Sequence, residues 1–140
     1  MLLTTNATET VAAYNGATPY AKDDEVNYLN SIYVSLAAAN TGHQPDLEPT
    51  WWIRKSANNT YSMFDEFVNT QTTQAPPLIV EVDPGGMFNS VSFFNLTGVK
   101  TITVVVNDGV AGPEVYNETF DLDDTTIIDW YMYFFEPYDL

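Results

Sequence analysis

The chain has 140 residues, of which 45% are hydrophobic and 20 are aromatic (3 Trp, 9 Tyr and 8 Phe), enough to fill the core of one ordinary domain or two very small ones. Its 19 acidic and 4 basic residues give a net charge of −15, which repels phosphates and argues against nucleic acid and anionic membranes as partners. Because there is no cysteine, a disulfide framework, a thiolate nucleophile and a cysteine-ligated zinc are excluded.

The first segment, residues 1–13, is polar and rich in threonine. It predicts either a short helix over 8–13, with Thr8 as the N-cap, or an extended arm. The start has neither a basic nor an apolar signal region, and no run of about 20 apolar residues follows. We therefore expect a soluble chain with no export signal and no membrane insertion.

Alternating polar and apolar residues over 25–29 and 32–36 predict two strands joined by a tight turn at Asn30-Ser31, that is, a β-hairpin. A helix over 32–39 is the alternative, favoured by three consecutive alanines. The β-branched and aromatic residues of the first half of this segment favour the strand.

A short apolar run at 51–53 precedes the polar, turn-rich segment 54–59, which we expect to separate two modules. The predicted organisation is an N-terminal arm at 1–13, a small β domain at 14–57 and a β-sandwich domain at 58–140. The second domain is either self-contained or completed by a partner or by further C-terminal strands.

The second domain contains several runs of β-branched and aromatic residues separated by turn signals such as Asp83-Pro84-Gly85-Gly86 and Asn107-Asp108-Gly109. The predicted strands are 78–82, 90–96, 101–106 and 114–122. The fold class is therefore all-β: a small three-stranded β module followed by an antiparallel β-sandwich or jelly-roll-like module.

The C-terminal segment 127–140 is strongly apolar, with one charge among its first nine residues. An uncovered apolar strand is an aggregation hazard, so we expect this segment to be buried in its own sheet, against another subunit or against a continuation of the chain. The candidate assembly residues share an aromatic side chain: Trp130, Tyr131, Tyr133, Phe134 and Phe135.

Enzymatic chemistry has little support in the sequence. The single histidine, His43, lies in a proline-flanked loop without a nucleophile motif, and no phosphate-binding loop is present. The acidic clusters at 23–25, 65–66 and 121–124 match no calcium-loop spacing and are expected to be solvated. We expect no catalytic residue, no metal and no cofactor.

Aromatic residues crowd the first domain and can either stack on sugar rings or build a core. If Trp51 and Trp52 lie in a strand they face opposite ways, so one of them points outward or toward the second module. The candidate glycan- or partner-binding residues are Tyr20, Tyr28, Tyr33, Trp51 and Trp52.

Residues 14–53 carry an ordered series of short motifs: YAKDDEV at 20–26, Tyr28, IYVSL at 32–36, NTGHQP at 40–45, and Trp51-Trp52. This series resembles the small carbohydrate-binding modules of the chitin-binding type, which also recur in bacteriophage tail proteins. The motifs of the second half, including FD at 64–65, TQTT at 70–73, the strand at 78–82 and Pro84-Gly85, resemble the region that follows such a module in phage virion proteins.

The resemblance implies a structural protein of a phage tail or baseplate, made in the bacterial host cytoplasm and located in the virion. It would act by docking to other tail or baseplate proteins in a multi-copy assembly, as a homo-oligomer. The alternative is a module that binds host surface glycans. Residues 37–39 are alanines where chitin-binding modules carry exposed tryptophans, a departure that favours docking.

Overall fold

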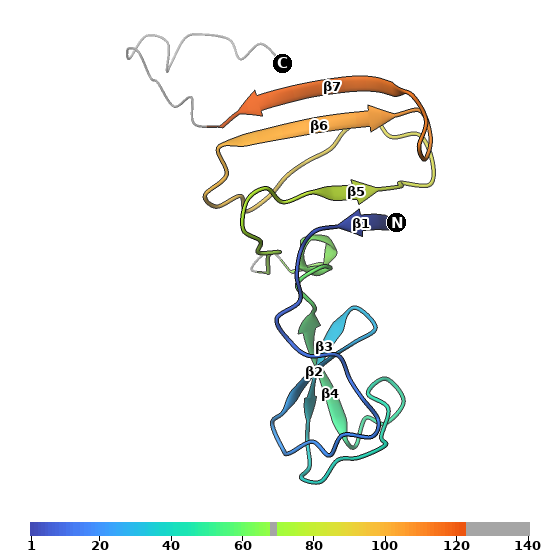
Figure 1. The fold of residues 1–140 in the computed structure, drawn as a ribbon, viewed down its shortest axis with the longest axis vertical. Helices are drawn as coiled ribbons and strands as arrows, with labels where there is room; N and C mark the ends of the chain where they lie inside the picture. Colours follow the sequence, from blue (N-terminus) through green and yellow to red (C-terminus); the bar gives the residue numbers. More distant parts are fainter. Residues whose placement is uncertain (68–69, 123–140) are drawn as a thin grey trace. The chain divides into compact units, whose positions relative to one another are not determined.

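The computed structural model describes residues 1–67 and 70–122, which form an all-β fold with one short 3-10 turn, η1 (Ser62–Phe64) (Figure 1). The all-β class predicted from the sequence is confirmed. The strands are β1 (Leu2–Thr5), β2 (Glu25–Tyr28), β3 (Ser31–Ser35), β4 (Trp52–Ala57), β5 (Val80–Val82), β6 (Thr101–Asn107) and β7 (Glu114–Asp121). They lie in two compact units, Met1–Asn95 and Leu96–Leu140.

The first unit contains an antiparallel sheet in the order β2-β3-β4. The predicted hairpin is confirmed, with Tyr28 opposite Ser31, and the alternative helix over 32–39 is wrong. The turn lies at Leu29-Asn30, one residue earlier than predicted, and both residues have positive φ, 44° and 63°. Such a two-residue turn matches the twist of the flanking strands.

Strand β4 runs through residues 54–57, where the sequence predicted a polar turn. Its pairing with β3 places Ile53 opposite Val34 and Arg54 opposite Tyr33. These polar residues suggested a turn because β4 is an edge strand whose Ile53, Arg54 and Lys55 are all exposed. Charged residues are common on such edges because they discourage pairing with another chain.

The N-terminal arm is extended, since residues 8–13 form no helix, and its strand β1 pairs antiparallel with β5. Figure 1 shows the N-terminal strand beside β5, about 75 residues further along the chain. Strand β5 covers only the second part of the predicted strand 78–82. The turn after it is confirmed: the backbone N–H of Gly85 (φ 73°) donates to Asp83 Oδ1 at 2.8 Å.

The strand predicted at 90–96 is wrong, because these residues are not assigned to any strand. Their side chains have the composition of a strand, yet Phe93 and Phe94 are exposed and no described segment pairs with this part of the backbone. A β-prone sequence forms a strand only where a neighbour accepts its hydrogen bonds.

The second unit contains the β6–β7 hairpin, which confirms the strands predicted at 101–106 and 114–122. The connecting segment, 108–113, is longer than the tight turn expected at 107–109, and it is closed by a hydrogen bond from Asp108 N to Pro113 O of 2.9 Å. Residues after 122 lie outside the described structure.

Among the described residues, the buried hydrophobic core lies in the three-stranded sheet: Val26, Ile32, Trp52 and Ala57. No residue between 59 and 67 or between 70 and 122 is buried. In the part of the chain that the structure describes, no helix is long and apolar enough to cross a membrane. Packing of the second domain as a sandwich or jelly roll stays a prediction.

Candidate functional site

One face of the three-stranded sheet carries a cluster of aromatic side chains. Antiparallel pairing places Val26 opposite Tyr33 and Ser35 opposite Trp52, so Tyr28, Tyr33 and Trp52 lie on the same face. The rings of Tyr28 and Tyr33 are 6.5 Å apart with an edge-to-face geometry. Four of the five predicted binding residues thus belong to one cluster: Tyr20, Tyr28, Tyr33 and Trp52.

Tyr14 contacts three rings of this cluster. It was not among the predicted site residues. Its ring lies 5.8 Å from Tyr20, 5.6 Å from Tyr28 and 5.8 Å from Trp52. Burial raises the pKa of Tyr14 above its usual value, and the neighbouring Tyr20, Tyr28 and Glu48 add to the shift. No local sequence pattern marks the Tyr14 ring as part of this cluster, because its three ring neighbours come from other segments of the chain.

Trp52 is the centre of the core and presents no face to a ligand. It is 2% exposed, its ring packs edge-on against Tyr20 at 5.3 Å, and its indole N–H donates to His43 O at 2.7 Å. A buried tryptophan whose N–H is satisfied contributes to stability through its large apolar area. Of the two tryptophans, only Trp51 is then available to a partner.

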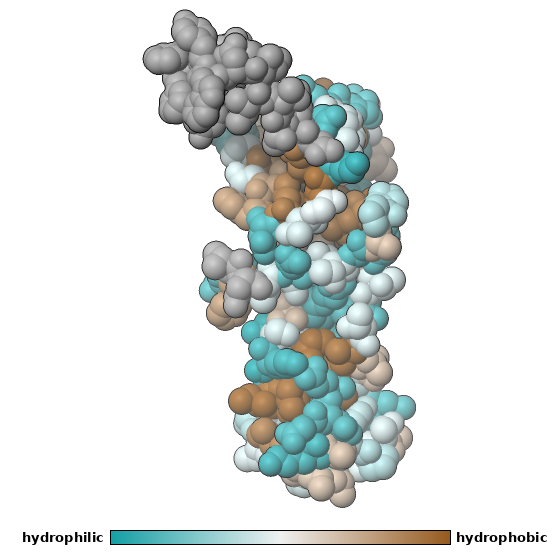
Figure 2. Space-filling view, turned by 90° about the vertical axis from the view of Figure 1, so that its left-hand side faces the viewer, coloured by the Kyte–Doolittle hydropathy of each residue, from teal (hydrophilic) through white to brown (hydrophobic). Residues whose placement is uncertain are grey.

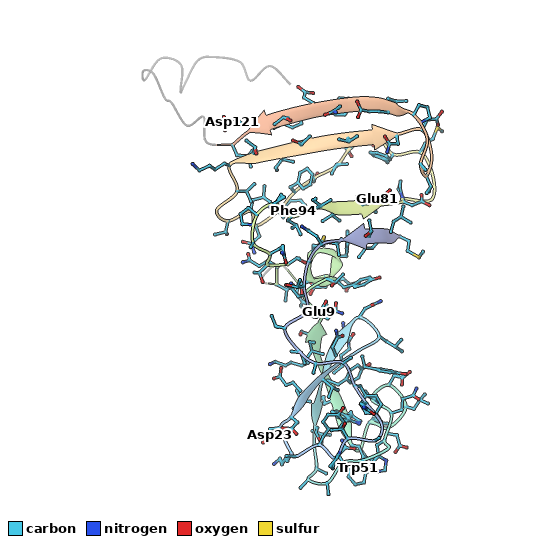
Figure 3. All side chains as sticks on the ribbon, viewed as in Figure 1. Glu9, Asp23, Trp51, Glu81, Phe94 and Asp121 are labelled. Carbon is cyan, nitrogen blue, oxygen red and sulfur yellow. The ribbon has the colours of Figure 1, made fainter. Side chains whose placement is uncertain are left out.

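Trp51 lies in the loop that leads into β4, where Figure 3 labels it, and it is only partly buried. The His43 ring stacks on it at 3.8 Å with an interplanar angle of 10°. His43 Nδ1 lies 3.3 Å from Glu48 Oε2. We call His43, Glu48 and Trp51 the ring platform.

The loop backbone holds the ring platform in place. The N–H groups of Trp51 and Trp52 both donate to Glu48 O, at 2.9 and 3.0 Å, and Glu48 N donates to Gln44 O at 3.1 Å. These successive turns hold residues 44–52 in one compact conformation. The platform is therefore preorganised, a flat aromatic surface with one carboxylate at its edge.

Asn40 holds the same loop through its side chain. The sequence analysis did not identify it as a site residue. It is fully buried, and its side-chain amide donates to Ser35 Oγ at 3.0 Å and to Trp51 O at 3.3 Å. The backbones of Asn40 and Tyr20 also exchange two hydrogen bonds. No pattern signals this role, because it depends on a bridge between distant loops.

The hydroxyl of Tyr20 is used within the fold: it accepts from Asn15 N at 2.7 Å. Tyr20 therefore offers little to a polar ligand. Of the five predicted residues, Trp52 is buried, whereas Tyr28, Tyr33 and Trp51 are partly exposed. The flat stacked surface, at Trp51, is the ring platform.

A second feature is the amount of apolar side chain on the surface after residue 77. Each of these side chains has more than a third of its area exposed, and Phe94, labelled in Figure 3, reaches 85%. Apolar patches are visible on the face drawn in Figure 2. We call this set the exposed apolar set: Leu78, Ile79, Val80, Val82, Met87, Phe88, Val91, Phe93, Phe94, Leu96, Val99, Val105, Val110, Val115, Tyr116, Phe120 and Leu122.

The predicted assembly residues Trp130, Tyr131, Tyr133, Phe134 and Phe135 lie outside the described residues. The exposed apolar set precedes them in the chain and was not identified as a surface feature from the sequence. Most of its members were assigned to strands, where they would be partly covered; Met87, Phe88, Val99 and Val110 lie between the predicted strands.

The acidic residues engage in local structure. Asp24 Oδ2 accepts from Ala21 N at 2.7 Å, Glu25 pairs with Lys55, and Asp65 Oδ1 accepts from Phe67 N at 2.9 Å. Across residues 1–67 and 70–122, no group of three or more His, Asp or Glu side chains could hold a metal ion.

Comparison with known proteins adds no relative to this description: no family model, no curated protein and no solved structure matches the chain.

Proposed function

We propose that this chain is a structural subunit of a multi-copy assembly, a phage tail or baseplate, and that it acts by protein–protein docking. The observation that carries the proposal is the contrast between the two parts of the chain. Every buried apolar residue among those described lies between 26 and 57, whereas the exposed apolar set spans 78–122.

Covering that set would supply the driving force for docking. Burying one large apolar side chain is worth about 1.5–3 kcal/mol, and exposed apolar patches on soluble domains commonly mark interaction sites. Phe94 and Met87 are almost wholly exposed, so a neighbour could gain most of this free energy at those two positions.

The backbone points the same way. Among residues 1–67 and 70–122, β1 pairs with β5 alone and β6 with β7 alone, and a two-stranded sheet is marginal in water without further packing. An adjoining subunit would supply further strands and cover for these sheets. The placement in a phage tail or baseplate rests on the resemblance of residues 14–53 to modules found in tail proteins.

The docking proposal is tested by the double substitution Met87→Ser and Phe94→Ser, followed by sedimentation velocity over a range of concentrations. We expect the unchanged chain to form a defined multimer and the double variant to shift to the monomer with its Trp52 core intact. The matched control is Leu47→Ser, which removes an apolar side chain that is 69% exposed in the loop before β4 and outside the exposed apolar set. A monomeric unchanged chain, or an equal loss of assembly in the control, would contradict the proposal.

The virion placement has a separate test, peptide mass spectrometry of purified particles of the phage whose genome encodes the chain. The chain should be present at a fixed ratio to the other tail proteins. If it occurs in the infected cell but is missing from the particle, the tail or baseplate assignment is wrong.

A second candidate function, glycan binding at the host surface, is favoured by the ring platform. Trp51 and His43 form a flat stacked pair that is partly exposed, and aromatic faces bind the C–H faces of sugars. Soluble host polysaccharides should then change tryptophan fluorescence.

The change should disappear in Trp51→Ala and persist in Phe64→Ala, a control that removes a ring 48% exposed at η1. If no polysaccharide alters the fluorescence of the unchanged chain, glycan binding is excluded and docking stands alone.

A further inference from the structure

Asn15 is the one asparagine of the chain that is followed by glycine. Its side chain closes a local turn, in which the Ala17 backbone N–H donates to Asn15 Oδ1 at 3.0 Å. Asn15, Gly16 and Ala17 are all exposed. The side-chain amide carbon of Asn15 is therefore open to water, and only carbons of its own residue separate it from the Gly16 nitrogen.

Backbone hydrogen bonds hold the turn but leave the Gly16 nitrogen unused. Asn15 N donates to the Tyr20 hydroxyl at 2.7 Å, and Asn15 O accepts from Thr18 N at 3.0 Å. Gly16 N donates to no group in the part of the chain that the structure describes. Because glycine has no side chain, its nitrogen can approach a neighbouring carbon closely. Gly16 N is thus a free nucleophile beside an exposed amide.

The hydrogen bond from Ala17 also favours attack on this amide. When a nitrogen adds to Asn15 Cγ, negative charge develops on Oδ1, and a backbone N–H that already points at Oδ1 stabilises that charge. The attacking and attacked groups belong to adjacent residues, so the reaction needs no encounter between separate molecules. The nucleophile, the electrophile and the donor are all in place within three consecutive residues.

Other exposed asparagines lack part of this arrangement. Asn30 is exposed, but the next residue, Ser31, is buried and is the first residue of β3. Asn89 is exposed and precedes the exposed Ser90, whose side chain hinders the approach of its nitrogen. The structure therefore singles out Asn15 among these positions.

We infer that Asn15 is a modification site, at which the chain reacts with water and loses ammonia without an enzyme. Gly16 N attacks Asn15 Cγ, an N–Cγ bond forms and the Cγ–Nδ2 bond breaks, so that ammonia leaves with the proton of the Gly16 N–H. Water then opens the cyclic imide at either carbonyl and leaves aspartate or isoaspartate. No oxidant or reductant takes part, and the inference does not depend on the docking proposal.

The modification would reach the ring cluster through Tyr20. The Tyr20 hydroxyl accepts from Asn15 N at 2.7 Å and donates to Asn15 O at 3.2 Å, and its ring packs against Tyr14 and Trp52. Both products add a negative charge at position 15, and isoaspartate lengthens the backbone there by a methylene group. The modified chain should therefore unfold at a lower urea concentration than the fresh chain, and equal midpoints would overturn this consequence.

The site is tested by incubating the full chain at neutral and at alkaline pH and following each asparagine by peptide mass spectrometry. Asn15 should be the first to show the mass gain of amide-to-acid conversion, and alkaline pH should speed the reaction because the attacking nitrogen must lose its proton. Asn89 is the internal reference and should convert at least about tenfold more slowly, since serine follows it.

Gly16→Ala is the matched variant, because it keeps Asn15. The added Cβ would lie 3.3 Å from the Tyr14 hydroxyl oxygen, a contact that a small shift of this side chain relieves. Conversion of Asn15 should slow by about tenfold in Gly16→Ala. If Asn15 stays unconverted, if Asn89 converts as fast, or if Gly16→Ala leaves the rate unchanged, the inference is overturned.

Discussion

The three-stranded sheet and the strands after residue 77 differ in how deeply their apolar side chains are buried. In the first, Trp52 is buried at the centre of a ring cluster and Val26 is 1% exposed. In the second, β7 has no buried position at all, and β6 alternates only between exposed and partly buried residues. Both regions contain the same kinds of residue, so composition alone does not decide whether a core forms.

The two regions differ in how many strands and loops pack against their apolar side chains. The three-stranded sheet is closed by loops that return over it, for example through the hydrogen bonds between Tyr14 and Asn27 and between Tyr20 and Asn40. In each of the two-stranded sheets, a strand has only one neighbouring strand among the described residues. A region whose described residues leave many apolar side chains exposed is suited to being covered by neighbours.

The largest effect on stability should follow from Trp52→Ala. The variant removes a ring that is 2% exposed and leaves a cavity, so the free energy of unfolding should fall by about 3–5 kcal/mol in urea titrations. Trp51→Ala is the neighbouring control and should cost far less, because Trp51 is only partly buried. Equal losses would contradict the division of roles between the two tryptophans.

Asn40→Ala should come next, with a loss of about 2 kcal/mol. The variant would lose the two hydrogen bonds that the buried side-chain amide donates, to Ser35 Oγ and to Trp51 O, and would leave a small cavity in their place. The same variant should loosen the ring platform, measured as increased solvent quenching of Trp51 fluorescence. The exposed Asn89→Ala is the control, and a similar loss there would rule out a special role for Asn40.

A smaller effect is expected from Glu9→Gln, about 1 kcal/mol, because one amide oxygen replaces the two carboxylate oxygens that accept from Asn59 and Thr60. The informative measurement is hydrogen exchange at those two backbone amides, which should become faster. The control is Glu81→Gln on the exposed strand β5. Unchanged exchange at Asn59 and Thr60 would show that the Glu9 carboxylate does not hold the N-terminal segment to these two residues.

The smallest predicted effect concerns pH. Because the pKa of Tyr14 is higher in the folded chain than its ordinary value of 10.0, the unfolded chain loses this proton first as the pH rises. Stability should therefore be unaffected by this group below pH 10.0 and fall as the pH rises from there through the folded pKa. Tyr14→Phe should weaken that alkaline loss in unfolding titrations, and an identical pH profile in the variant would contradict the assignment.

Local patterns predicted what depends on local structure. The hairpin of β2 and β3 follows from alternation. The prediction that Trp51 and Trp52 face opposite ways assumed that both lie in a strand, whereas β4 begins at Trp52. The turn between β2 and β3 was misplaced by one residue because it uses Leu29, a residue that rarely adopts positive φ.

The errors share a physical cause, which is long-range pairing. The three-stranded module was predicted, but residues 54–57 of β4 were predicted as a turn because Arg54 and Lys55 resemble one unless the chain is known to lie at a sheet edge. The strand expected at 90–96 has no partner among the described residues, and the pairing of β1 with β5 joins segments that no window of sequence connects. The stack of His43 on Trp51 likewise depends on the closure of the loop between them.

Hydrogen exchange on the assembled and the dissociated chain tests the central claim most directly. The account predicts that peptides containing β5, β6 and β7 gain protection on assembly, while peptides from β2 to β4 are protected to the same degree in both states. If assembly leaves β5, β6 and β7 unprotected, or protects the three-stranded sheet instead, the exposed apolar set is not the docking surface.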